Sequence, residues 1–124
     1  MSRAAIIFSR VLLAVLLLFM PYATLSPGTS PPSDVASHMH FYTMAFLAVL
    51  ACSCFKTFGA RLGAVLFVFG YSALMEFFQH LLPYRHGNWD DVMTNFLGCL
   101  AGVGFFYAVY WAGQAAKHIW NYGN

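Results

Sequence analysis

The chain has 124 residues, of which 60% are hydrophobic and only 8% are charged, and its mean hydropathy is +0.66. Ordinary soluble domains carry about 25% charged residues, so this chain has too little charge to cover a water-exposed surface. The composition therefore excludes an ordinary soluble domain and predicts an integral membrane protein. A net charge of +2 without any run of basic residues argues against nucleic-acid binding.

Four apolar runs follow one another along the chain, and each is close to the roughly 20 residues that cross a bilayer. They occupy residues 4–25, 35–55, 62–82 and 91–112. The predicted fold is all-α, a single domain over residues 1–124 that forms a bundle of four transmembrane helices. The first run also resembles a secretory signal peptide, but it is long for one, and we expect a retained helix. Residues 113–124 are expected to form an interfacial tail.

The orientation follows from the basic residues. If the N-terminus is cytoplasmic, five of the six lie on the cytoplasmic side: Arg3, Arg10, Lys56, Arg61 and Lys117. Only Arg85 lies outside. This bias predicts that both termini are cytoplasmic.

With this topology the polar residues gather at the periplasmic ends of the second, third and fourth helices. Three sets share a helix face by their spacing: Asp34, His38 and Tyr42; Glu76, Gln79 and His80; and Asp91 and Asn95. Their convergence predicts a polar cleft with Arg85 at its mouth. Gly98 and Gly102 continue the face of Asn95 as a small-xxx-small pattern, which predicts close helix packing.

Simpler roles remain open for several of these residues. Asp34 and Asp91 are each suited to be helix N-caps, and Arg85 to anchor at lipid headgroups. Glu76 lies inside a helix, where capping does not explain a carboxylate, although an ion pair with Arg85 or a histidine does. An ionisable residue at this depth is a functional-site hypothesis by default.

No metal site and no cofactor are predicted. The three cysteines, Cys52, Cys54 and Cys99, lie in apolar segments without a zinc-type spacing, and we expect them to be packing residues. A haem or metal between His38 and His80 lacks any supporting motif. His40, His86 and His118 are expected to be interfacial or packing residues.

The combined pattern of Glu76, Gln79, Arg85, Asp91, Asn95, Gly98 and Gly102 resembles the VanZ-like family of membrane proteins. Gly70-Tyr71 and, on the second helix, Asp34, His38 and Tyr42 extend the resemblance. The chain departs from the family at Val35, where a lysine is usual, and at Asn88, where a serine is often found.

The resemblance implies a small polytopic protein of the bacterial envelope, in a family whose founding member is associated with resistance to the glycopeptide teicoplanin. One reading is a site for a lipid-linked or glycopeptide-like ligand, with Arg85 and His38 holding an anionic headgroup. Whether this site is catalytic is left open, and the candidates for catalysis are Glu76, His38 and Asp91. The alternative is a non-catalytic subunit that packs on a larger membrane complex, with the polar cluster as a clamp between helices.

Overall fold

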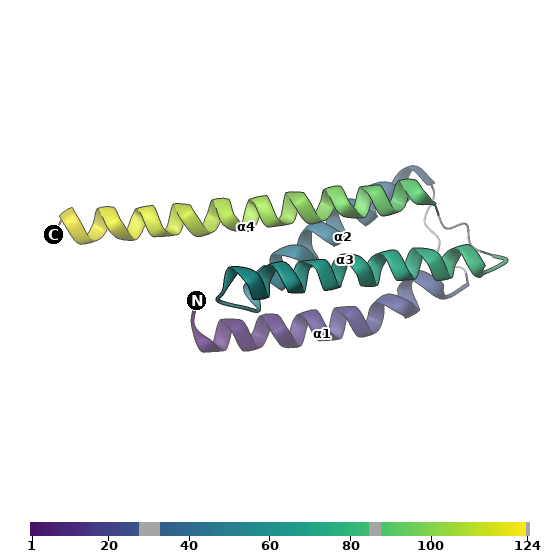
Figure 1. Cartoon of the computed structure of the whole chain (residues 1–124), viewed down its shortest axis with the longest axis horizontal. Coiled ribbons are helices and arrows are strands. Elements are labelled where there is room, and N and C mark those ends of the chain that lie inside the picture. The colour runs from purple at the N-terminus through teal and green to yellow at the C-terminus, as the bar shows by residue number, and fades with distance from the viewer. Residues whose placement is uncertain (28–32, 85–87, 124) are drawn as a thin grey trace.

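The computed structural model describes residues 1–27, 33–84 and 88–123, without the side chains of Ser33 and Asp34. The described residues form four helices: α1 (Arg3–Leu25), α2 (Ser33–Ser53), α3 (Phe58–Leu81) and α4 (Trp89–Gly123). Each is long and apolar enough to cross a membrane. The helices alternate in direction, so both chain ends lie at the same end of the bundle (Figure 1).

The largest differences from the expected helix boundaries are at the start of α3 and at the end of α4, and the other ends agree within two residues. Thr57 caps α3 by accepting a hydrogen bond from the Ala60 N–H, so α3 begins at Phe58, four residues earlier than expected. Helix α4 continues past residue 112 to Gly123, through a segment without proline, and it extends beyond the other helices (Figure 1). The expected tail is therefore helical.

The core lies mainly between α2 and α4, which form the most extensive contact in the bundle. Two glycines of α4 make this approach possible. A Cβ at Gly98 would lie 2.5 Å from the Phe41 carbonyl oxygen, and a Cβ at Gly102 would overlap the Ala45 carbonyl oxygen. The predicted packing role of both glycines follows from this contact, because only a residue without a side chain lets the backbones approach so closely.

Helix α3 also satisfies carbonyl groups that α1 cannot satisfy itself. Pro21 has no N–H, so the Leu17 carbonyl loses its partner four residues on. The Tyr71 hydroxyl donates to that carbonyl at 3.1 Å, and Gln79 Nε2 donates to the Thr24 carbonyl at 2.9 Å, in the last turn of α1. These bonds fix α3 against α1 near the end of the bundle away from the chain termini.

Two arginines make hydrogen bonds between segments at the opposite end of the bundle, where the chain termini lie. Arg10 Nε donates to the Cys54 carbonyl and Arg61 Nε to the Phe55 carbonyl, each at 3.0 Å. Arg61 is buried, and its guanidinium lies 4.9 Å from the ring centroid of Phe106. Cations are favourable where a helix ends, because the last carbonyls of α2 carry partial negative charge. The three cysteines are buried and free, in agreement with a packing role.

Most of the outer surface is apolar. Large side chains such as Leu18, Phe8 and Phe105 are 64–81% exposed, and they cover the outside of the helices. A soluble protein seldom exposes so much contiguous apolar surface, whereas lipid-facing helices must. The fold and the surface together are those of a multi-pass membrane protein.

Candidate functional site

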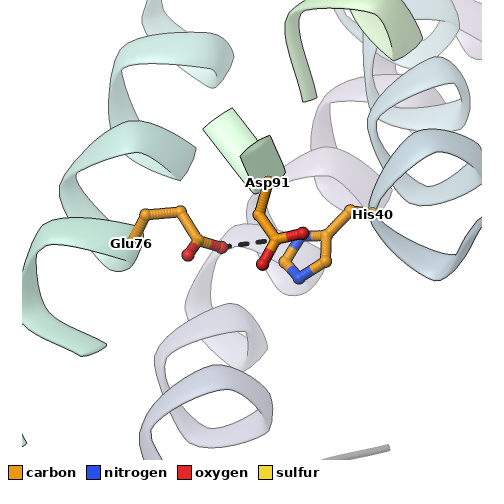
Figure 2. A group of neighbouring side chains, drawn as sticks. All are labelled: His40, Glu76 and Asp91. Atoms are coloured by element: carbon orange, nitrogen blue, oxygen red, sulfur yellow. Dashed lines mark ion pairs between the residues drawn. The ribbon is translucent and has the colours of Figure 1, made fainter. Parts of the chain in front are cut away.

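Three titratable side chains from three helices converge at the end of the bundle away from the chain termini. His40 lies on α2, Glu76 on α3 and Asp91 on α4, and their ligand atoms all lie within 4.8 Å of one another. His40 Nδ1 is 3.6 Å from Glu76 Oε1, and Figure 2 shows the three side chains pointing toward one another. We call these three residues the polar cluster.

Glu76 is buried because of its place on α3. The buried face of α3 carries Arg61, Val65, Val68, Ser72, Met75, Glu76 and Gln79, which follow the helical repeat. This face is apolar along its middle and becomes polar from Ser72 onward. The carboxylate of Glu76 is thus held inside the bundle at 5% exposure, facing α2 and α4 rather than lipid.

His40 reaches the cluster for a similar reason. It precedes Met44 and Leu47 by four and seven residues, and both of these are in the core. His40 is half-buried, with its side chain 24% exposed. His40 is therefore a polar residue on the side of α2 that faces the core.

Asp91 is available to the cluster because another residue caps α4. The Asn88 side chain accepts a hydrogen bond of 3.1 Å from the Asp90 N–H, and the Asn88 carbonyl accepts one of 3.0 Å from the Asp91 N–H. Asn88 thus does what an N-cap residue does, and Asp91 lies in the first turn of α4. The capping role considered for Asp91 does not hold. Asp91 is half-buried, and its neighbour Asp90 is exposed.

A buried hydrogen bond lies one helical turn from the cluster. Asn95 Nδ2 donates to Ser72 Oγ at 2.6 Å, and both side chains are 1% exposed. Asn95 is four residues after Asp91, and Ser72 is four residues before Glu76. The bond therefore fixes the two helices that carry the carboxylates relative to each other.

A pocket of about 570 Å³ adjoins the cluster. Its polar lining includes His40, Glu76, Gln79 and Asn95, and much of the rest is apolar. The apolar lining comes largely from α1 and α2: Leu16, Phe19, Met20, Ala23, Ala36, Met39, Met44, Phe46 and Leu47. A second pocket of about 160 Å³ also borders Glu76, between α3 and α4, with His80 and Asn88 in its lining. Glu76 is thus the residue that both pockets share.

The structure brings together some of the predicted site residues and separates others. Glu76 and Asp91 meet in the cluster, Gln79 and Asn95 line the large pocket, and Tyr42 lines it although 68% exposed. His38, the histidine predicted to line the cleft, is exposed, whereas His40 lies beside Glu76. The side chain of Asp34, and all of Arg85 and His86, lie outside the described residues.

Two residues of the site were missed by the sequence analysis. His40 was assigned to packing, because spacing alone grouped His38 with Tyr42. The available signal was the register of His40 with the apolar positions Met44 and Leu47. Ser72 was not selected at all, although it lies one turn before Glu76.

Four membrane-length helices with a polar cluster near one end of the bundle define a small polytopic membrane protein. Comparison with known protein families identifies the family of this membrane protein. The VanZ/LLP1 family matches residues 5–110, and the chain belongs to that family. No curated protein and no solved structure matches the chain.

Proposed function

We propose that this VanZ-family protein binds a lipid-linked or glycopeptide-like ligand of the bacterial envelope at an outward-facing polar site, and thereby contributes to glycopeptide tolerance. The observation that carries this proposal is the pocket of about 570 Å³, whose lining is mostly apolar and includes a few polar groups, among them His40, Glu76 and Asn95. That division is typical of small-molecule sites, in which apolar surface gives affinity and a few polar groups give specificity.

The shape of the pocket favours a lipid-linked ligand over a fully polar one. Leu16, Phe19 and Met20 of α1 provide surface for an acyl or isoprenoid chain, while Glu76 of α3 and Asn95 of α4 line the same cavity. A ligand with an apolar tail and a polar headgroup has the same division. The Glu76 carboxylate would accept hydrogen bonds from headgroup hydroxyl or amide groups, or act as an acid or base toward them. Arg85 is assigned to the anionic part of the ligand from the sequence alone.

The charge distribution supports an outward-facing site. Five of the six basic residues belong to the part of the chain assigned to the cytoplasmic side, and the polar cluster belongs to the opposite end of the bundle. The site would then face the periplasm, in the cytoplasmic membrane of the bacterium.

A susceptibility assay tests the proposal. Cells that produce Glu76→Gln or Arg85→Ala should lose the teicoplanin tolerance that the wild-type protein gives, with equal amounts of protein in the membrane. Asp90→Asn is the matched control, since Asp90 is exposed and is not part of the cluster. Unchanged tolerance with both Glu76→Gln and Arg85→Ala would contradict the proposal.

One observation favours a second function, that of an accessory subunit of a larger membrane complex. Helix α4 extends beyond the bundle (Figure 1), and its exposed residues after residue 112 include Trp120 and Tyr122. Aromatic residues of this kind are frequent at protein interfaces. Sizing in mild detergent separates the two functions: stoichiometric co-purification of another membrane protein supports the subunit, and a lone small species argues against it.

A further inference from the structure

We propose that the polar cluster of His40, Glu76 and Asp91 binds a divalent cation of the zinc and manganese class. The three residues come from three different helices, and one potential ligand atom of each lies within 4.8 Å of the other two. Ions of this class take imidazole nitrogen and carboxylate oxygen together as ligands. The inference does not depend on the lipid-linked ligand, because an ion can bind with or without one.

The distance between His40 and Glu76 is the first argument. Their nearest atoms are 3.6 Å apart, longer than the N–H···O hydrogen bond limit of about 3.2 Å. Two ligands that share one tetrahedral zinc ion, with bonds of about 2.1 Å, are about 3.4 Å apart. The spacing of this pair is thus close to that of two ligands on one ion, and Asp91 lies within 4.8 Å of both.

The charge of the cluster is the second argument. Glu76 is buried and Asp91 half-buried, and their carboxylates lie within 4.8 Å of each other, where like charges repel more strongly than in bulk water. His40 adds a ring nitrogen to the same point. A divalent cation between the two carboxylates would offset both charges and be held by all three residues.

The buried amide oxygen of Asn95 is the third, independent argument. The side chain of Asn95 is 1% exposed and lines the large pocket with His40 and Glu76. Nδ2 is held by Ser72, while Oδ1 accepts no hydrogen bond from any described residue. A buried oxygen without a donor is unfavourable, because it has lost its hydrogen bonds to water. An amide oxygen of this kind is suited to bind a cation, directly or through a water molecule on it.

The donor types limit the choice of ion. The cluster has one imidazole and two carboxylates, and none of the buried cysteines belongs to it. Soft ions such as Cu(I) prefer thiolate or thioether ligands, and Ca²⁺ prefers 6–8 oxygen ligands. Three protein ligands with a remaining open position are typical of zinc sites that bind a further molecule.

Metal titration of matched variant pairs tests the inference. The full chain, purified in mild detergent with a tag that contains no histidine and stripped with a chelator, is titrated with ZnCl₂ and with MnCl₂. We expect one ion of either metal per chain, and a loss of affinity of at least about tenfold in His40→Gln and in Asp91→Asn. His38→Gln is the control for His40→Gln, and Asp90→Asn is the control for Asp91→Asn. Both controls lie at exposed positions close to the cluster residue and should bind the metals as the wild type does.

Absence of saturable binding to the wild-type chain would overturn the inference, and so would an equal loss of affinity in both members of a pair. X-ray absorption of the wild-type zinc complex keeps the test decisive if a cluster variant does not fold. It should show one imidazole nitrogen and oxygen ligands at about 2.0–2.2 Å. A shell that contains sulfur, or two or more imidazoles, would contradict the assignment.

Discussion

Asn95 of α4 and Ser72 of α3 share a hydrogen bond of 2.6 Å in the interior of the bundle, one turn from the two carboxylates of the polar cluster. The bond connects the helices that carry Glu76 and Asp91. The geometry of the site therefore depends on a hydrogen bond in which neither carboxylate takes part.

Ser72→Ala should destabilise the bundle, because it leaves the buried Nδ2 of Asn95 without an acceptor among the described residues. Hydrogen bonds between membrane helices contribute about 0.6–2 kcal/mol, and we expect a loss of that size in the free energy of unfolding. Denaturation with sodium dodecyl sulfate in mixed micelles measures it. Ser53→Ala is the control, since the Ser53 hydroxyl bonds to the Val49 carbonyl of its own helix. Equal stability of the two variants would contradict the prediction.

Gly102→Ala should separate α2 from α4. Its Cβ would overlap the Ala45 carbonyl, and the backbone cannot move aside as a flexible side chain can. Overpacking of this kind typically costs about 1–3 kcal/mol. Gly104→Ala makes the same change two residues later, where nothing lies within 4 Å of the added Cβ. Unfolding in mixed micelles should therefore show a large loss for Gly102→Ala and none for Gly104→Ala, and similar losses would argue against the helix contact.

Tyr71→Phe removes the hydroxyl that donates to the Leu17 carbonyl, which Pro21 leaves without its usual helical partner. The expected cost is about 1 kcal/mol, typical of one buried hydrogen bond. Tyr22→Phe is the matched control, because Tyr22 is 64% exposed on the outside of α1. The pair is compared by the same denaturation. A stability of Tyr71→Phe equal to that of Tyr22→Phe would show that the Leu17 carbonyl is satisfied in another way.

The direction of the chain in the membrane is a prediction from its basic residues alone. A reporter that is active only in the cytoplasm should be active when it is fused after Asn124, and a reporter that needs the periplasm should be inactive there. Removing the charges of Arg3 and Arg10 together should weaken this bias. Periplasmic activity of the fusion to the unaltered chain would reverse the orientation and place the polar cluster on the cytoplasmic side.

The membrane class and the four helices could be predicted from the sequence because they depend on local composition. An apolar run of about 20 residues satisfies its own backbone hydrogen bonds as a helix wherever it lies in the bilayer. The helix ends were less predictable. Whether α3 begins at Phe58 or Leu62 depends on the cap at Thr57, and the length of α4 depends on a segment with weak hydrophobicity.

The sequence by itself identified Glu76, Asp91 and Asn95 as polar residues near one end of the bundle, and Gly98 and Gly102 as a packing face. It could not determine which histidine meets Glu76, because His38 and His40 both lie near the start of α2. That choice depends on the rotation of α2 about its axis, which is set by the packing of Met44 and Leu47 in the core and by the fit of Ala45 against Gly102. Two residues along a helix correspond to about 200° of rotation, so this packing alone turns His40 toward the site and leaves His38 exposed.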